Sequence, residues 1–118
     1  MSKIKYVYVA GPYRKPDPVE NTHNAVRVAD QISDMGFVPF IPHAATLLWH
    51  AIVPHVEQYW LDYDNEWLAK CDAVLRIPGE SKGSDAEERL ARSLGIPVFY
   101  SVEELVFGAK ELSMIGVQ

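Results

Sequence analysis

The hydrophobic positions along the chain follow two alternating patterns. Short apolar runs rich in β-branched residues, such as KIKYVYVA before Gly11-Pro12, are typical of buried strands. Longer segments repeat apolar residues at helical spacing, as Ala25, Ala29 and Ile32 do ahead of Gly36. The predicted strands cover residues 4–10, 37–42, 72–77 and 96–100. The predicted helices cover residues 18–35, a short stretch from 43, residues 56–70 after a break near Pro54, residues 84–95, and a last helix from 101.

Strands therefore alternate with helices, and the strands are mostly apolar on both faces. This pattern is typical of a parallel sheet that is covered by helices on each side. Pro39 lies inside the second predicted strand, which favours a place near an edge of the sheet. We expect a single α/β domain over residues 1–118, with a parallel sheet of four to five strands flanked by helices.

Three loops are predicted to converge at one end of this sheet. In parallel sheets, ligands bind at the carboxyl ends of the strands, near the point where the strand order reverses. The segments AGPYR and PGESKG follow the first and third predicted strands, and PHAATLLWH follows the second. We therefore expect a crevice there that is lined by polar and aromatic side chains.

Composition and charge exclude several classes of function. The net charge is −5 and no basic run is present, which argues against binding of a nucleic-acid polymer. No long apolar span or charged leader occurs, so we expect a cytoplasmic protein without a membrane segment. The single Cys71 excludes an internal disulfide. His43, His50 and His55 lack a metal-ligand spacing, so we expect no metal and no cofactor.

Glu87 has two interpretations from the residues alone. Ser84 and Glu87 have the spacing of a capping box, in which Glu87 would return to the Ser84 amide at a helix start. Alternatively, Glu87 faces a ligand, because the preceding loop PGESKGS offers small residues and free amides that suit a phosphate.

Two further side chains have similar alternatives. Asp64 lies on a predicted helix beside aromatic residues, and it is either a solvated surface residue or a general acid whose proton is retained by partial burial. Tyr8 lies near the end of the first predicted strand, and it is either a core residue or a hydrogen-bond donor to a carboxylate in the crevice. Aromatic residues cluster nearby, at Trp49, Tyr59, Trp60 and Trp67, mostly as core candidates, although one or two suit stacking on a nucleobase.

The segments YVAGP (8–12), DNEWLAKCD (64–72) and SKGSDAE (81–87), followed by LGIPVF, resemble the nucleoside 2-deoxyribosyltransferase superfamily. The similarity is greatest to its small branch of nucleoside 5′-monophosphate N-glycosidases, and it spans most of the chain. The resemblance implies a Rossmann-like (flavodoxin-like) sheet and a homodimer or higher homo-oligomer that completes its sites across the interface. Aromatic residues in 49–67 are consistent with such a contact.

The resemblance also implies a role for each residue of the motifs. Glu87 is the expected nucleophile, Tyr8 its orienting residue, and Asp64 the acid and base near the nucleobase. With the resemblance included, the catalytic interpretation of Glu87 is favoured over the cap. Lys82 and Arg14 are possible helpers at the phosphate. The expected substrate-binding residues are Gly11, Pro12, Tyr13, Arg14, His43, Ser81, Gly83 and Ser84.

We therefore expect an N-glycosidase that hydrolyses the base–sugar bond of nucleoside 5′-monophosphates, most naturally 2′-deoxynucleotides. Ser81 favours this branch, since the transferases carry an Asp there that contacts the sugar. Transfer of deoxyribose between bases is the first alternative. A nucleotide-binding module without turnover is the second.

Overall fold

Strands and helices alternate along the whole of the computed structural model, which describes residues 3–13 and 15–117. The strands are β1 (Tyr6–Ala10), β2 (Val38–Phe40), β3 (Ala73–Arg76) and β4 (Val98–Phe99). The helices are α1 (Pro18–Asp34), α2 (Pro42–Ile52), α3 (Glu57–Leu68), α4 (Lys82–Ser93) and α5 (Val102–Val117). The predicted α/β fold with a flavodoxin-like, flanked parallel sheet is confirmed. Arg14, an expected substrate-binding residue, lies outside the described residues.

The sheet has the strand order β2-β1-β3-β4, and all its neighbours pair in parallel. Tyr8 on β1 pairs with Phe40 on one side and with Val74 on the other. The chain runs from β1 outward to β2 and then crosses to β3, so the order reverses between β1 and β3. Ligand crevices form outside the carboxyl ends of such a pair of strands.

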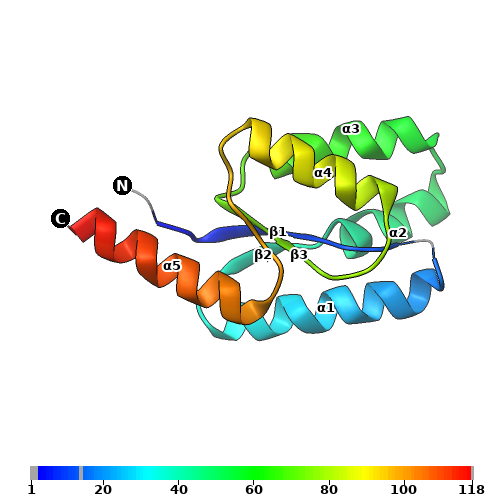
Figure 1. Ribbon diagram of the computed structural model, residues 1–118. Coiled ribbons are helices and arrows are strands. Elements are labelled where there is room, and N and C mark those ends of the chain that lie inside the picture. The colour runs from blue at the N-terminus through cyan, green and yellow to red at the C-terminus, as the bar shows by residue number, and fades with distance from the viewer. Residues whose placement is uncertain (1–2, 14, 118) are drawn as a thin grey trace.

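Two helices cover each face of the sheet, with α1 and α5 on one side and α3 and α4 on the other (Figure 1). Successive side chains of β1 point to opposite faces. Val7 and Val9 pack with Ile32 of α1 and Leu105 of α5. Tyr8 belongs to the second core cluster, which includes Leu68 of α3 and Ala91 of α4. Tyr8 is therefore on the same side of the sheet as α3 and α4.

Local sequence signals set several element boundaries. Asp17 caps α1 by accepting hydrogen bonds from the amides of Val19 (2.9 Å) and Glu20 (3.4 Å). Gly36 follows α1 with a φ of 101°, a conformation that glycine adopts at little cost. The second strand is at the edge of the sheet, as Pro39 predicted. The largest difference in a helix start is at α4, which begins at Lys82 and not at 84, whereas α2, α3 and α5 begin within one residue of the predicted positions.

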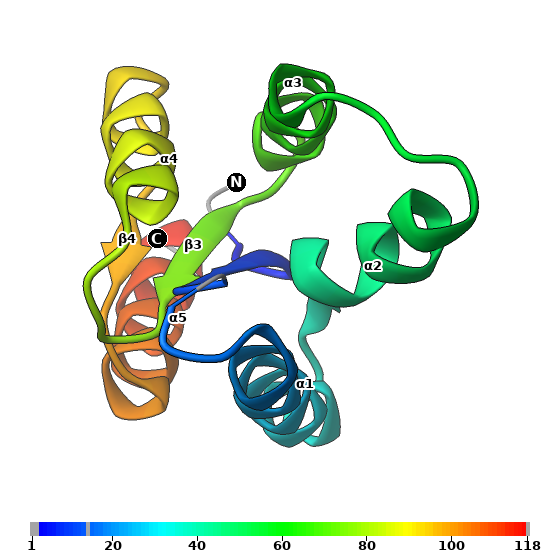
Figure 2. The ribbon, with the colours of Figure 1, turned by 90° about the vertical axis from the view of Figure 1, so that its right-hand side faces the viewer.

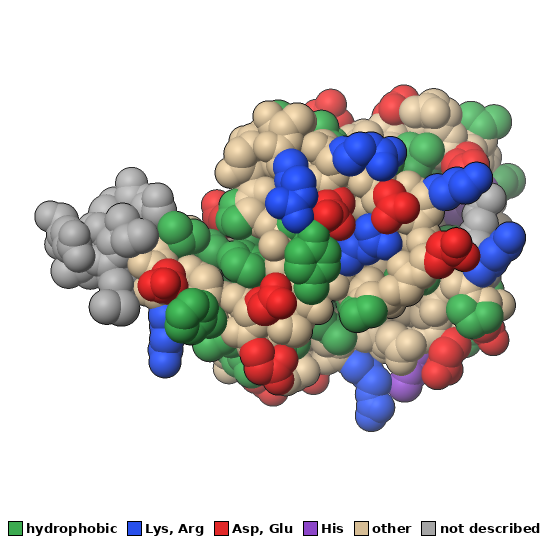
Figure 3. Space-filling model, viewed as in Figure 1, with side chains coloured by type: hydrophobic (Ala, Val, Ile, Leu, Met, Phe, Trp, Pro, Cys, Tyr) green, Lys and Arg blue, Asp and Glu red, His purple; other side chains and the backbone are tan. Residues whose placement is uncertain are grey.

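The molecular surface mixes both signs of charge. On the face seen in Figure 3, Lys and Arg side chains lie among Asp and Glu side chains. Some of these charges pair, as Arg92 and Glu88 do at 3.2 Å along α4. Among the described residues, no helix combines the length and apolar character needed to cross a bilayer.

Candidate active site

A cavity of about 830 Å³ lies at the carboxyl ends of β1 and β3, where the strand order reverses. Figure 2 shows α2, α3 and α4 arranged around this end of the sheet. The lining residues come from four segments: Gly11, Tyr13 and Lys15 after β1; Pro42, His43, Thr46 and His50 of α2; His55, Glu57, Trp60, Leu61 and Asp64 at α3; and Glu80, Ser81, Lys82, Gly83, Ser84, Asp85 and Glu87 at α4. The three loops that the sequence places at this end therefore meet around one cavity.

The floor of this region is formed by close contact between the loops after β1 and β3. A Cβ at Gly11 would lie 3.0 Å from Ile77 Cβ, and a Cβ at Gly79 would lie 2.5 Å from Pro12 Cγ. Gly79 also has a φ of 135°, which side-chain-bearing residues rarely adopt. Pro12 is not among the residues that line the cavity. Its ring packs near Gly79, and its carbonyl accepts a hydrogen bond from His43 Nε2 (2.8 Å).

Glu87 does not cap α4, so the capping-box interpretation is wrong. The N-cap is Ser81, whose Oγ accepts a hydrogen bond from the Ser84 amide (3.1 Å). Because the helix begins at Lys82, Glu87 lies beyond its first turn, and its side chain is too far along the helix to cap the first amides. Instead, Glu87 Oε2 accepts a hydrogen bond from the Tyr8 hydroxyl. Glu87 Oε1 has no hydrogen-bond partner among the described residues, and Glu87 lines the cavity.

Tyr8 combines the two interpretations that its sequence position allowed. It is fully buried beneath the cavity, and its ring stacks on Phe40 with 5.7 Å between centroids. Its hydroxyl nevertheless reaches across to α4 and holds the Glu87 carboxyl group. Burial, reinforced by the charges of Glu87 and Asp64, raises the pKa of Tyr8 well above its usual value. Tyr8 is therefore a permanent proton donor to Glu87.

Asp64 and Glu87 are two carboxyl groups that line the same cavity from neighbouring helices, α3 and α4. Burial raises the pKa of Asp64 to about 7, and its Oδ1 is buried without a partner. Burial also raises the pKa of Glu87 to about 7. The charge of Asp64 acts in the same direction on Glu87, whereas the Tyr8 hydrogen bond and Arg76 oppose it. Because both pKa values are about 7, one of the two groups can carry a proton at neutral pH while the other is ionised, which suits one acid and one ionised group.

This burial predicts a stability that depends on pH. The folded protein binds protons at Asp64 and Glu87 more tightly than the unfolded chain, because both folded pKa values are about 7, whereas the usual values for these side chains are 3.8 and 4.5. Stability from this source is complete below about pH 4 and is lost as pH rises through 7. We expect the free energy of unfolding, measured in urea, to fall between pH 5 and pH 8. In Glu87→Gln the fall is smaller by on the order of 2–3 kcal/mol. Equal pH dependence in the two proteins would contradict a buried carboxyl group at Glu87.

Arg76 organises the loop and the helix start that form one wall. This side chain, 11% exposed, contacts Asp85 at 2.5 Å and Glu88 at 3.4 Å, and donates to the Gly79 carbonyl at 3.0 Å. Asp85 lies in the first turn of α4 and lines the cavity. The guanidinium therefore balances the negative charge of Asp85 beside the cavity, and it fixes the loop between β3 and α4 to the helix.

Three buried polar atoms beside the cavity lack a partner among the described residues: His43 Nδ1, Asp64 Oδ1 and Ser84 Oγ. Because the Pro12 carbonyl can only accept, the His43 proton is on Nε2 and its Nδ1 is an acceptor. Burial lowers the pKa of His43, so the neutral ring predominates. Tyr13 contacts this ring edge-on at 5.3 Å. Unpaired polar groups of this kind are costly, and a polar ligand would satisfy them.

The cavity-facing sides of two helices were predicted only in part, because His43 and Asp64 were expected at the site, Trp60 was considered mainly for the core, and Thr46 and His50 were not identified. His43, Thr46 and His50 have helical spacing on α2, and all line the cavity. Trp60 and Asp64 are likewise four residues apart on α3. Of the four aromatic residues considered, Trp60 is the one that lines the cavity, whereas Trp67 stacks on Phe40 at 5.1 Å. Helical periodicity of the polar residues, rather than the apolar ones, would have identified both sides.

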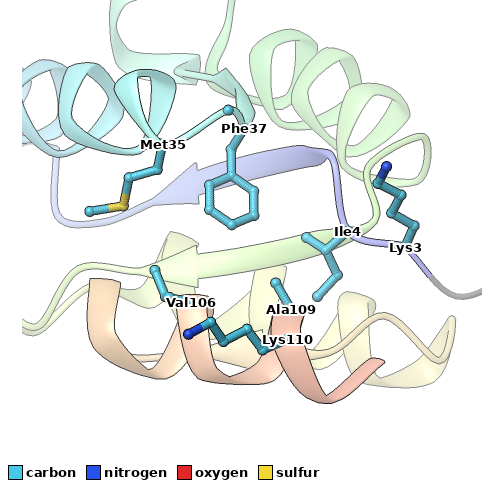
Figure 4. A pocket seen from close by; sticks show the side chains of 8 residues that line it. Lys3, Ile4, Met35, Phe37, Val106, Ala109 and Lys110 are labelled. Carbon is cyan, nitrogen blue, oxygen red and sulfur yellow. The ribbon is translucent and has the colours of Figure 1, made fainter. Parts of the chain in front are cut away.

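A second cavity, of about 460 Å³, lies at the opposite end of the sheet, between the start of β1 and α5 (Figure 4). Its side chains are mainly apolar, including Ile4, Phe37 and Val106, with Lys3 and Lys110 at its margin. No acidic, histidine or hydroxyl side chain is among the described residues that line it. No group of three or more His, Cys, Asp or Glu in the described part of the chain could hold a metal ion. Of these two cavities, the first is therefore the one lined by carboxyl, imidazole and hydroxyl groups.

Comparison with known proteins agrees with this architecture. A solved structure of a 2-deoxyribosyltransferase from the psychrotolerant bacterium Bacillus psychrosaccharolyticus matches with a TM-score of 0.58 and 22% sequence identity. The match covers 79% of this chain and 69% of that chain, and it shows a shared fold. No curated protein matches. The family model described as a domain of unknown function, DUF7768, matches residues 5–101. The chain therefore belongs to the DUF7768 family.

Proposed function

We propose that this protein is an N-glycosidase that hydrolyses the base–sugar bond of 2′-deoxynucleoside 5′-monophosphates. The observation that carries the proposal is the pair of carboxyl groups in one cavity. Glu87 is held by the Tyr8 hydroxyl, and Asp64 faces the same space from another helix. The fold shared with a 2-deoxyribosyltransferase supports glycosyl chemistry at this position. The sequence resemblance assigns the nucleophile to Glu87 and the acid to Asp64.

The proposed reaction has two steps. In the first, ionised Glu87 attacks the anomeric carbon C1′ through Oε1 while the C1′–N bond to the base breaks. The electron pair of that bond leaves with the base, and protonated Asp64 supplies a proton to it. In the second step, Asp64 removes a proton from water, and the resulting hydroxide displaces Glu87 from C1′. The products are the free base and 2-deoxyribose 5-phosphate, and both carboxyl groups return to their starting states.

The amino-terminal end of α4 is the proposed phosphate site. The amides of Lys82 and Gly83 are in the first turn, where no helical carbonyl is available to accept from them. A helix start of this kind favours an anion. Gly83 lines the cavity, and a Cβ there would meet only Ser81 Oγ, at 3.9 Å. Neither backbone conformation nor packing therefore requires glycine at 83, and its small size leaves room for a phosphate.

Gly83→Ala tests this phosphate site. We expect the variant to fold, because the added methyl group makes only an ordinary contact with Ser81 Oγ, at 3.9 Å, and alanine is favoured over glycine in helices by about 1 kcal/mol. The methyl group should obstruct the phosphate, so KM for a deoxynucleoside monophosphate should rise roughly tenfold. A rise of this size corresponds to the loss of about one good hydrogen bond. The matching nucleoside, which has no phosphate, is the control substrate. An equal rise for both substrates would contradict a phosphate contact at 83.

Deoxyribose transfer between bases is the second candidate, favoured by the activity named for the matched structure. The two reactions differ in whether water or a second base receives the sugar. A panel of deoxynucleoside monophosphates and deoxynucleosides, with and without an added acceptor base, separates them by chromatography. Hydrolysis predicts free base and sugar phosphate without an acceptor. Product formed only when the acceptor is present would establish transfer, and absence of both products would contradict either reaction.

We also propose that a second copy of this chain covers an apolar surface on α2 and the segment after it. Leu48, Ile52 and Val56 are 69%, 70% and 74% exposed, and the surface continues through Val53. Large apolar areas of this kind mark protein contacts. Sedimentation equilibrium should give twice the 13.3 kDa chain mass, and Ile52→Lys should lower it to the chain mass. A wild-type protein with the mass of one chain would contradict this interface.

A further inference from the structure

His50 lies in the last turn of α2 and faces the cavity beside Trp60 of α3. The Trp60 indole Nε1 donates a hydrogen bond to His50 Nδ1 at 2.7 Å. The backbone amide of His55 donates to the same nitrogen at 3.2 Å. Both partners are donors only, so His50 Nδ1 is an acceptor without a proton. The proton of the neutral ring is therefore on Nε2.

The other ring nitrogen is thus a positioned donor. His50 is exposed, and its Nε2 has no hydrogen-bond partner among the described residues. Two contacts from different segments hold the ring, so the Nε2–H group is oriented before a ligand binds. A fixed donor of this kind distinguishes an acceptor on the ligand from another donor, because two donors that face each other both lose their partners.

The position of His50 relates it to the base end of the substrate. In the proposed reaction, the phosphate is at the start of α4 and Asp64 is beside the departing base. Trp60 is one helical turn before Asp64 on α3, so the two side chains share a side of that helix. His50 is joined to Trp60, and therefore belongs to the wall of the cavity that α2 and α3 form with Asp64, whereas the proposed phosphate site is on α4.

We propose that His50 Nε2–H donates a hydrogen bond to a carbonyl oxygen on the base, and so selects oxo bases over amino bases. This inference rests on the proposed function. It divides substrates by one substituent, the 6-position of a purine or the 4-position of a pyrimidine. Hypoxanthine and uracil carry an oxygen acceptor there, whereas adenine and cytosine carry an amino donor. Because the contact recognises the base, it should change the ratio of kcat/KM between two substrates that differ only in this substituent.

The test compares kcat/KM for base release within two pairs, dIMP with dAMP and dUMP with dCMP. In each ring class that is cleaved, we expect the oxo member to be preferred by about tenfold or more, the cost of leaving one donor unpaired. His50→Phe should remove the preference, and His50→Gln, which retains an N–H donor, should keep part of it. Trp60→Phe, which removes the indole donor but keeps a ring, should reduce the preference without altering His50 itself.

Controls separate this contact from folding and from the reaction. His23→Phe, an exposed change on α1 away from the cavity, should leave both ratios unchanged. Thermal unfolding of each variant shows whether it is folded. If His50→Phe does not fold, Trp60→Phe still tests the contact. Equal rates within each pair for the wild-type protein would overturn the selectivity while leaving the N-glycosidase standing. A uniform loss across all substrates in His50→Phe would also overturn it. Release of no base from any of the four would remove the proposed function and this inference together.

Discussion

Glu87→Gln should lose base release by about 10³-fold or more, because glutamine has no ionised oxygen to attack the anomeric carbon. The substitution keeps the size of the side chain and an acceptor for the Tyr8 hydroxyl, so the fold should be preserved. Affinity for a deoxynucleoside monophosphate, measured by calorimetry, should change little, since the proposed phosphate contacts are at the start of α4. The measurement is steady-state release of free base.

The neighbouring residue is a matched control for this result. Glu88 is on the same helix but does not line the cavity, and its carboxyl group pairs with Arg92, the Tyr100 hydroxyl and, at 3.4 Å, Arg76. Glu88→Gln should therefore retain most of the activity. If Glu87→Gln kept a tenth of the wild-type rate, Glu87 would not be the nucleophile. If it also lost nucleotide binding, the carboxyl group would have a role in recognition instead.

Asp64→Asn should lower base release by about 10²–10⁴-fold, the range for loss of a general acid. Asparagine cannot give a proton to the departing base, so the loss of rate should depend on how readily the base departs without being protonated. A 7-methylguanine nucleotide carries a positive charge on its base and departs as a neutral molecule without protonation. We expect this substrate to be affected far less than dIMP. The measurement is kcat for both substrates in both proteins.

Asp62 supplies the control on the same helix. It accepts a hydrogen bond from Gln58 at 2.8 Å on the exposed side of α3, outside the cavity. Asp62→Asn should leave both substrates unaffected. Equal losses for 7-methylguanine and hypoxanthine nucleotides in Asp64→Asn would argue against proton donation to the base. Asp64 would then be a binding residue that acts on every substrate alike.

The sheet and the position of the cavity could be predicted, because the hydrophobic and turn patterns that indicate them are local and recur along the chain. Apolar runs that end at turn residues predicted each strand, and the order of strands and helices predicted a parallel sheet. Pro39 predicted an edge strand, and β2 lies at the edge. The crevice at the carboxyl ends of β1 and β3 followed from a general property of such sheets, and the cavity is there.

The start of α4 could not be predicted, because the local signal favours the wrong serine. Ser84 has a glutamate three residues later, as a capping box does, whereas Ser81 is followed by Gly83, and only the path of the chain after β3 selects Ser81. That path is set by non-local contacts: Gly79 against Pro12, and Arg76 with the Gly79 carbonyl. The choice of Ser81 moves the N-cap three residues back from Ser84, and it leaves the Glu87 side chain free to accept a hydrogen bond from Tyr8.

The wall formed by α2 and α3 was predicted only in part. The segment after the second strand, His43 and Asp64 were expected at the crevice, but the aromatic residues were taken mostly as core candidates, since aromatic residues are mostly buried. The structure joins His50 to Trp60 by a hydrogen bond between two helices. Such a pairing depends on how α2 and α3 pack together, which no local pattern encodes.

The proposed reaction requires a covalent bond between Glu87 and the anomeric carbon. A deoxynucleotide with fluorine at C2′ should form this intermediate and hydrolyse it slowly, because fluorine destabilises positive charge at C1′. Mass spectrometry of the intact protein should then show one added fluorodeoxyribose phosphate, and the fragments of the digested protein should locate it at Glu87. Base release without an adduct at Glu87, or an adduct at another residue, would contradict the proposed role of Glu87 as the nucleophile.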